Sequence, residues 1–254
     1  MGDIYVFDAF GTAHREQAST HSAIKSASKA CAGLLLERET EFLSKALNNY
    51  DHPYIAVIGG AKVSTKLELI KHINSVADQI IVGGGIANTF LKASGLKIGK
   101  SLVEDSMLDI AKDLLVQGKI VLPNVIITSK TFEGEDIRET SVKDVKDEEM
   151  ILDLHLSDEI LTSLNQAKTI LWNGPMGVFE NKLFSKGTKD LSIAIANSSA
   201  FSIAGGGETL SAINKYIKSD DVSYCSTGGG AFLEFMEGKN LSSIDVLNSK
   251  EIGS

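Results

Sequence analysis

Four glycine-rich junctions constrain the fold of this chain most strongly, because each follows an apolar run and precedes a helical pattern. They are Ile55–Gly60, Ile80–Gly85, Phe201–Gly207 and Tyr224–Gly230. A single glycine triplet is more often a tight turn, since glycine adopts positive φ angles without steric cost. Repeated strand–glycine–helix steps instead bring backbone N–H groups and helix N-termini to one edge of a parallel sheet, where phosphate is stabilised. Four such junctions in one chain predict the layout of a nucleotide site.

The segments between the junctions predict an alternation of strands and helices. We expect strands at 4–10, 54–59, 79–83, 169–173, 201–204 and 221–226, and further strands near 119–129. We expect helices at 20–49, 62–75, 86–93, 104–117, 157–166, 183–197, 208–217 and 230–237, and a polar surface connection with short strands over 130–150. Helices of this length between strands favour right-handed βαβ units. The fold class is therefore expected to be α/β, with a doubly wound parallel sheet covered by helices on both faces.

Composition and charge exclude several classes of function. The net charge of the 254 residues is −8, and arginine occurs at Arg15, Arg38 and Arg138 alone. We therefore expect no general attraction to nucleic acid or to anionic membranes. No apolar run approaches the roughly 18 residues of a membrane-spanning helix, and the first residues lack the basic and apolar regions of a signal peptide. These features predict a cytoplasmic protein.

The cysteines and histidines do not indicate a metal site. Cys31 and Cys225 lack metal-ligand spacing, and the five histidines form no cluster in the sequence. Because both cysteines stand among apolar or small residues, we expect them to be buried free thiols.

The spacing of the glycines does not match two common phosphate motifs. A dinucleotide fingerprint needs a third glycine where this chain has Asn88, Leu210 and Leu233. Ser94–Ser101 ends as a P-loop does, but it begins with serine and follows a helical pattern instead of a strand. We interpret this stretch as a helix C-cap and a loop.

Two lysines follow the first glycine junction. We expect Lys62 in the first turn of the helix at 62–75 and Lys66 one turn later, so that both side chains share the face directed at whatever the glycines bind. Lysine is a mobile point charge, which suits a phosphoryl group that moves during a reaction. Exposed lysines are usually surface charge, but their place beside Gly59 and Gly60 favours a role in the site.

The segment Trp172–Glu180 combines a strand end, a Gly-Pro turn and an apolar patch that ends in a carboxylate. An adenosine needs apolar contacts for its base and an acceptor for its ribose hydroxyls. On its own a turn of this composition is more often structural. Beside the glycine junctions it predicts a base and ribose site, with Glu180 as the acceptor.

Five segments, in this order, closely resemble the signatures of the phosphoglycerate kinase family, and they cover nearly the whole chain. They are Asp8–Arg15, Gly59–Lys66, Trp172–Glu180, Gly205–Thr209 and Ser226–Ala231. The resemblance implies reversible phosphoryl transfer between the acyl phosphate of 1,3-bisphosphoglycerate and ADP, giving 3-phosphoglycerate and ATP, with Mg²⁺. It also implies a cleft between two Rossmann-like three-layer αβα domains, and a complete protein that is a monomer.

On the nucleotide side, the resemblance implies a role for each matching residue. Lys66 would contact the nucleotide phosphates, and Lys62 would stabilise the phosphoryl group in transit. Glu180 would bind the ribose, and Glu208 would bind the metal. Further nucleotide contacts are expected at Gly60, Gly84, Asn173, Pro175, Gly177, Val178, Gly206, Gly207 and Thr209.

On the acceptor side, the resemblance implies that the backbone amides of Gly229 and Gly230 stabilise the transferring group. His14 and Arg15 match part of the basic patch that binds 3-phosphoglycerate, and Arg15 is also expected to take part in catalysis. The other arginines of that patch would lie in a preceding domain. With so few arginines in this chain, we expect its acceptor site to be largely absent.

The resemblance also divides the chain. Residues 1–33 match the end of an N-terminal domain and the start of a hinge, 34–238 the nucleotide domain, and 239–254 a C-terminal tail. The chain is thus expected to be N-terminally truncated. We expect 34–238 to fold alone, the tail to be poorly ordered, and the strand within 1–33 to present an unpaired edge that promotes self-association.

The chain departs from the family pattern in three places. Phe7 stands where asparagine is usual, Glu208 replaces an aspartate, and the tail lacks a Pro-Gly pair. The extra methylene of Glu208 is expected to shift the geometry at the metal.

The sequence is compatible with three functions. The chain is part of a kinase that is active when complete, or it is a nucleotide-binding module without turnover. An NAD-dependent dehydrogenase would share the fold but fails all three glycine spacings.

Overall fold

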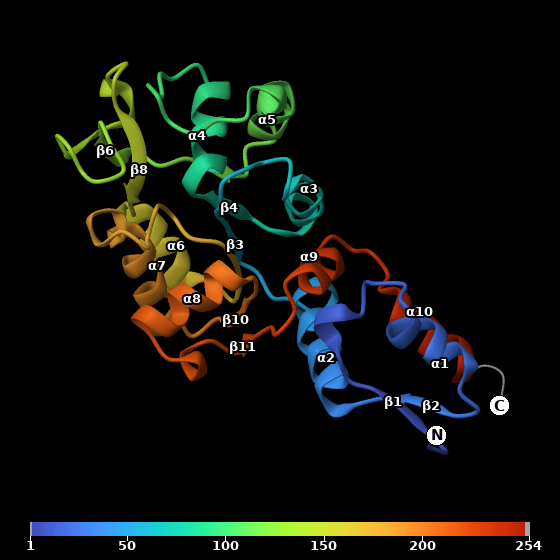
Figure 1. Ribbon diagram of the computed structural model, residues 1–254. Helices are drawn as coiled ribbons and strands as arrows, with labels where there is room; N and C mark the ends of the chain where they lie inside the picture. Colours follow the sequence, from blue (N-terminus) through green and yellow to red (C-terminus); the bar gives the residue numbers. More distant parts are fainter. Residues whose placement is uncertain (1, 252–254) are drawn as a thin grey trace.

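A six-stranded parallel sheet forms the centre of the computed structural model, which describes residues 2–251 (Figure 1). The strands in spatial order are β11 (Tyr224–Cys225), β10 (Phe201–Ala204), β9 (Thr169–Asn173), β3 (Tyr54–Ile58), β4 (Gln79–Val82) and β5 (Ile120–Val121). From β3 the chain first builds one side of the sheet through β4 and β5, and then the other side through β9, β10 and β11. The order therefore reverses between β3 and β9, and the expected doubly wound parallel sheet is confirmed.

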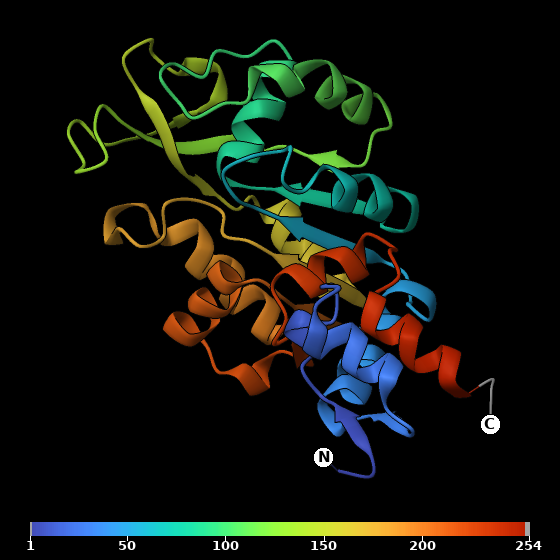
Figure 2. The same cartoon turned by 45° about the vertical axis from the view of Figure 1, so that its right-hand side comes forward.

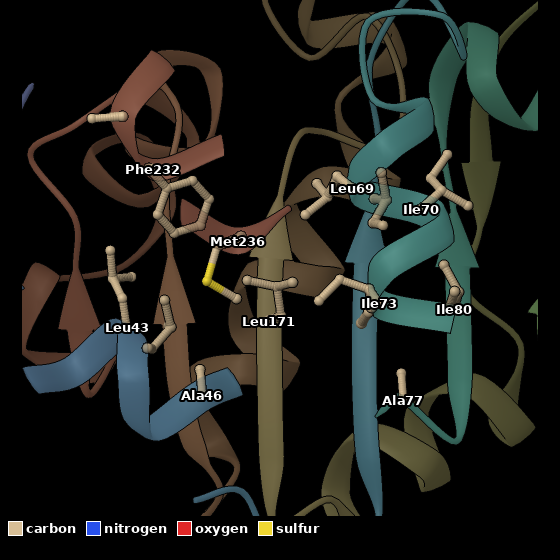
Figure 3. Packing of buried hydrophobic residues seen from close by; sticks show 14 of the residues in the cluster. Leu43, Ala46, Leu69, Ile70, Ile73, Ala77, Ile80, Leu171, Phe232 and Met236 are labelled. Carbon is tan, nitrogen blue, oxygen red and sulfur yellow. The ribbon is translucent and has the colours of Figure 1, made fainter. Parts of the chain in front are cut away.

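Helices cover both faces of this sheet. They are α2 (Leu34–Asn48), α3 (Leu67–Val76), α4 (Gly84–Ala93), α5 (Leu108–Val116), α6 (Asp158–Gln166), α7 (Lys186–Asn197), α8 (Gly207–Tyr216) and α9 (Gly230–Met236). Alternate residues of the fully buried strand β3 belong to opposite apolar clusters, as the period of two in a strand requires. Figure 3 shows one cluster, in which Leu43 of α2, Ile73 of α3 and Met236 of α9 pack around Leu171 of β9.

A second, antiparallel sheet was not expected from the sequence. Its strands are β7 (Arg138–Ser141), β6 (Val125–Ser129) and β8 (Met150–His155), in that order. In Figure 1 it lies at the end of the molecule opposite the two termini. The sequence predicts short strands in the surface connection 130–150, and β7 is one of them; its antiparallel pairing with β6 was not predicted. Strand β8 was not predicted, because Asp153 and His155 interrupt its apolar pattern.

The prediction of one helix over 20–49 is wrong, because the strand β2 interrupts this segment. A π-helical turn at Ala18–Ser22 leads into the short helix α1 (Ala23–Ser26), after which β2 (Ala30–Ala32) pairs with β1 (Tyr5–Phe7). Gly33 then continues the pairing through its N–H to the carbonyl of Phe7, 2.9 Å away. The carboxylate of Asp8 accepts the N–H of Leu36 at 2.8 Å, so it satisfies a free donor in the first turn of α2.

The tail is ordered where the structure describes it, which corrects our expectation. Helix α10 (Ser242–Glu251) packs beside α1 (Figure 2). Leu241 and Leu247 are buried, and Ser243 donates hydrogen bonds to the carbonyls of Ala13 and Thr20. These contacts fasten the tail to the N-terminal segment. Residues 252–254 lie outside the described residues.

The cysteines are free, as expected, but neither is buried. Cys31 is exposed and Cys225 is half-buried. Cys31 belongs to the two-stranded sheet β1–β2.

Within residues 2–251 we find no helix with the length and apolarity needed to cross a bilayer.

Candidate functional site

The candidate site lies where β3 and β9 separate, because the glycine-rich loops that follow these strands meet there. The N–H of Gly59 donates to the carbonyl of Asn173 at 3.0 Å, and the N–H of Gly84 donates to the carbonyl of Met176 at 2.8 Å. A Cβ atom on Gly59 would overlap the carbonyl oxygen of Pro175. Glycine is required at this point for close approach of two backbones. Crevices at such reversals of strand order are the usual ligand sites of open α/β sheets.

The two lysines do not share a helix face, which corrects the sequence-based expectation. Helix α3 begins at Leu67, with Lys66 as its N-cap, and Lys62 lies in the loop before it. The loop cannot be helical because the buried Val63 inserts into the core and its carbonyl accepts the N–H of Lys66 at 3.0 Å. As a result Lys62 is exposed, whereas Lys66 is half-buried.

The ammonium of Lys66 sits between the ends of the two strands. It donates to the carbonyl oxygens of Gly59 at 2.5 Å and Asn173 at 2.9 Å. Burial lowers the pKa of Lys66 to about 8, and the nearby negative charge of Glu208 opposes this effect. Lys66 is thus a cation with little solvent around it, placed at the crevice, as a phosphate contact requires.

A cavity of about 180 Å³ opens at the glycine-rich loops. Lys66 does not line it, but a Cβ atom on Gly60, which does, would lie 3.4 Å from Nζ of Lys66. The cavity is lined by seven of the residues expected to bind nucleotide: Gly60, Gly84, Pro175, Gly177, Val178, Glu180 and Glu208. Its remaining lining is mostly apolar and was missed by the sequence reasoning: Ala61, Gly85, Asn88, Leu102, Phe132, Met150, Ile151 and Leu152. The cavity thus joins an apolar wall to a glycine-rich edge and two carboxylates.

The apolar wall comes from three separate segments. Leu102 follows α4, Phe132 lies in the loop between β6 and β7, and Leu152 lies on β8. Leu102 and Phe132 are each 54% exposed although they are large and apolar. Such exposure is a signal of a binding surface only once the structure is known, because nothing in the sequence separates these residues from core residues.

Helix α8 directs its N-terminus to the same place. Its N-cap Gly206 has a φ of 94°, and Gly207 and Glu208 in the first turn are exposed. The N–H groups of a first helical turn have no helical acceptor and attract anions. The hydroxyl oxygen of Thr209 is already engaged within the protein, because Oγ1 accepts the N–H of Gly174 at 2.8 Å.

Asn173 has one buried polar atom without a partner in the described residues. Its Nδ2 donates to the carbonyl of Gly205 at 2.7 Å, whereas its Oδ1 has no hydrogen bond. An unpaired buried acceptor is costly, so it points to a donor that arrives with a ligand.

His14 meets the second helix N-terminus. A Cβ atom on Gly230 would lie 2.8 Å from Nε2 of His14, and one on Gly228 would lie 2.6 Å from the Phe10 ring. The N-terminal segment therefore packs against the start of α9. Arg15 is exposed, and neither it nor Gly229, Gly230 or Lys62 lines the cavity.

Glu39 is a structural residue of the site that the sequence reasoning missed. Its fully buried carboxylate accepts from Oγ of Ser226 at 2.8 Å, from N–H of Thr227 at 2.6 Å and from Oγ1 of Thr227 at 2.7 Å. It therefore fixes the turn that leads into α9. No sequence signal marks it, because a glutamate on an amphipathic helix is usually a surface residue.

The candidate metal ligand is a single carboxylate. Glu208 is exposed at the start of α8, and no group of three metal-ligating side chains occurs in the described residues. This arrangement suits Mg²⁺, which commonly binds one or two carboxylates together with substrate phosphates and water.

Known proteins resemble this chain over nearly its full length. A family model described as phosphoglycerate kinase matches residues 1–239. The phosphoglycerate kinase of Blochmanniella floridana is 53% identical over 248 residues, which cover 96% of this chain and 62% of that protein. That of Blochmanniella pennsylvanica is 52% identical over 257 residues, with 99% and 65% covered. The chain thus spans less than two thirds of the length of these curated relatives.

A solved structure agrees with this similarity. Phosphoglycerate kinase from Coxiella burnetii matches the fold with a TM-score of 0.93 at 46% identity, covering 98% of this chain and 66% of that one.

Proposed function

The chain belongs to the phosphoglycerate kinase family, and we propose that its function is the phosphoryl transfer for which that family is named. The reaction is reversible, depends on Mg²⁺, and converts 1,3-bisphosphoglycerate and ADP to 3-phosphoglycerate and ATP, a step of glycolysis. Membership of the family removes the NAD-dependent dehydrogenase from the alternatives. The monomeric state of the complete protein and its cytoplasmic location stay part of this proposal.

One observation carries the proposal. The apolar cavity, the ammonium of Lys66 and the N-terminus of α8 lie around one crevice. A nucleotide bound there would have suitable contacts for its base, its ribose and its phosphates, one after the other along the molecule. Leu102, Phe132 and Leu152 offer apolar contacts to the base, and Glu180 offers an acceptor to the ribose hydroxyls.

The phosphates would extend toward Lys66 and the first turn of α8. Phosphate oxygens can take the place of the carbonyls of Gly59 and Asn173 as acceptors for the ammonium. Because phosphate is an anion, its arrival stabilises the charged form of Lys66 against the effect of burial. The free N–H groups of Gly207 and Glu208 supply further donors.

Glu208 would hold the magnesium ion together with the nucleotide phosphates. When bound, the ion neutralises charge on the phosphates during transfer. Glu208 lines the same cavity, and its negative charge partly offsets the lowering of the Lys66 pKa by burial.

The transfer itself requires charge neutralisation more than a covalent nucleophile. An oxygen of the terminal ADP phosphate attacks the phosphorus of the acyl phosphate, and the bond from that phosphorus to the carboxylate oxygen breaks. The exposed Lys62 is suited to follow the moving group. We assign the amides of Gly229 and Gly230 to the same group, and His14 and Arg15 to the acceptor.

A paired measurement tests the proposal. The chain is titrated with MgADP by calorimetry, and the same sample is assayed for phosphoryl transfer from ATP to 3-phosphoglycerate. Binding with turnover supports a complete kinase site. Binding without turnover supports the alternative, a nucleotide module whose acceptor residues are supplied elsewhere. A failure of MgADP to bind contradicts both.

A further inference from the structure

The segment Leu102–Glu104 touches both halves of the candidate nucleotide site. Leu102 lines the apolar cavity, and Glu104, two residues later, contacts the loop 60–66 that carries both lysines. The segment is itself attached to α4 at two points. Nδ2 of Asn88 donates to the carbonyl of Leu102 at 3.2 Å, and the N–H of Glu104 donates to Oγ1 of the buried Thr89, also at 3.2 Å.

Glu104 holds the lysine loop with both carboxylate oxygens. The N–H of Ser64 donates to Oε2 at 2.8 Å, and the hydroxyl of Ser64 donates to Oε1. Burial alone would raise the pKa of Glu104, but the hydrogen bonds from Ser64 and the nearby charge of Lys62 outweigh it and hold the pKa below its usual value. Both contacts are therefore charge-assisted at neutral pH.

The two ends of the loop are anchored separately: the carbonyl of Gly60 accepts the N–H of Ile86 at 3.1 Å, and the ammonium of Lys66 donates to carbonyls at the ends of β3 and β9. Within it, the N–H of Lys66 donates to the carbonyl of Val63, and Oγ1 of Thr65 donates to the carbonyl of Lys62. Among the hydrogen bonds of residues 61–65 in the described part of the chain, those of Ser64 with Glu104 are the ones that reach another segment. Without them, the apolar insertion of Val63 would be the main restraint on the position of Lys62.

We propose that Glu104 is a positioning residue, which fixes the Lys62–Lys66 loop for binding phosphate and couples that loop to the base wall through Leu102. The inference rests on the proposed function, because it takes the phosphate group of a nucleotide as the ligand of the loop. Glu104 itself acts through Ser64 and does not touch the ligand.

A competing role for Glu104 predicts the opposite change in MgADP affinity when the carboxylate is neutralised. If the carboxylate served as a counter-charge that weakens Lys62, its neutralisation would strengthen the binding of an anion. Glu104→Gln separates the two roles, because the amide keeps an acceptor for the N–H of Ser64 and offers a donor to its hydroxyl, while the charge is lost. Positioning predicts that Glu104→Gln binds MgADP more weakly than the wild type but more tightly than Glu104→Ala, because its hydrogen bonds to Ser64 persist without the charge.

The experiment compares adenosine with MgADP, since adenosine lacks the phosphates that the loop would bind. Both are titrated by calorimetry into the wild type, Glu104→Ala and Glu104→Gln. Asp105→Ala is the matched control, because this neighbouring carboxylate pairs with Lys92 on the surface and not with the loop. Losing charge-assisted hydrogen bonds predicts that Glu104→Ala binds MgADP about tenfold or more weakly, while its adenosine affinity changes less than about twofold. Asp105→Ala should bind MgADP as the wild type does, and the MgADP affinity of Glu104→Gln should lie between those of the wild type and Glu104→Ala.

Three results would overturn the inference. They are an equal loss of adenosine and MgADP affinity in Glu104→Ala, no loss of either, or tighter MgADP binding in Glu104→Gln. Hydrogen exchange adds a readout that needs no ligand: amides of residues 62–66 should exchange faster in Glu104→Ala than in Asp105→Ala. If the wild type binds neither adenosine nor MgADP, the proposed function fails, and unchanged exchange in Glu104→Ala would then refute the anchoring role separately.

Discussion

The ammonium of Lys66 is a largely buried cation in the candidate site. It lies between two backbone carbonyls at the ends of β3 and β9, where burial lowers its pKa to about 8. The sequence indicated that Lys66 belongs to the site but not how it is held, because its environment comes from two strands that are far apart in the chain.

The lowered pKa of Lys66 predicts a pH dependence of nucleotide binding. Above about pH 8 the amine of the ligand-free site loses its proton, so MgADP affinity should fall by up to about tenfold for each further pH unit. Calorimetric titrations at about pH 7 and about pH 9 measure this fall. Lys66→Met should bind weakly at both values, whereas Lys71→Met, an exposed lysine paired with Glu68, should behave as the wild type. An unchanged affinity of the wild type across this range would contradict the assignment.

The buried carboxylate of Glu39 predicts a large effect on stability. Glu39→Ala leaves the N–H of Thr227 and the hydroxyl of Ser226 without acceptors, which should lower the free energy of unfolding by about 2–4 kcal/mol. Denaturant unfolding measures the change. Glu37→Ala on the exposed face of the same helix is the control and should change stability by less than about 0.5 kcal/mol. Equal effects of the two substitutions would show that the contacts of Glu39 contribute nothing.

At the scale of elements, the sequence predicted the parallel sheet and its glycine-rich edge correctly. Strand ends of a parallel sheet meet at one edge, so local patterns such as Ile55–Gly60 also carry tertiary information. The apolar wall was not predictable, because Leu102, Phe132 and Leu152 come from three segments that meet only in the folded chain. The start of α3 was wrong because helix periodicity at 62–66 competes with the burial of Val63, and burial prevails.

The contact between β8 and α7 predicts a pH-dependent stability. One oxygen of Asp153 on β8 accepts the N–H of Gly187 on α7 at 2.9 Å, and the other has no partner in the described residues. Burial raises the pKa of Asp153 to about 7. The folded state therefore binds more protons than the unfolded state between about pH 4 and pH 7, so this residue's contribution to stability falls as pH rises through that window.

Asp153→Asn should remove this dependence. Relative to the variant, the wild type should lose on the order of 4 kcal/mol between about pH 4 and pH 7. Chemical unfolding of both proteins across this range measures the difference. Parallel stability profiles would contradict the raised pKa.

At the scale of the whole molecule, the N-terminal segment joins the main core instead of standing apart from it. Phe7, Phe10 and Ala13 belong to the same apolar cluster as the inner face of α2 and α9. The division of the chain at residues 33 and 238, and the ability of 34–238 to fold alone, stay predictions. The sheet β1–β2 has two strands. Val6 in β1 and Ile4 just before it are more than half exposed, at 56% and 57%.

This exposed pair predicts self-association of the chain. Strand edges with apolar side chains favour pairing between molecules. We expect the sedimentation coefficient to rise with protein concentration, and Val6→Lys to suppress that rise. Val116→Lys is the control, since Val116 is 87% exposed on α5, away from this sheet. Association that persists in Val6→Lys would place the contact elsewhere.

We propose that the crevice between β3 and β9 binds a nucleotide, with its base on the apolar wall and its phosphates at Lys66 and α8. A crystal structure of the chain with MgADP tests it most directly. We expect the adenine against Leu102, Phe132 and Leu152. The ribose hydroxyls should lie at Glu180, and phosphate oxygens within hydrogen-bond distance of Lys66. An ADP molecule bound away from this cavity, or bound with its phosphates turned from Lys66, would contradict it.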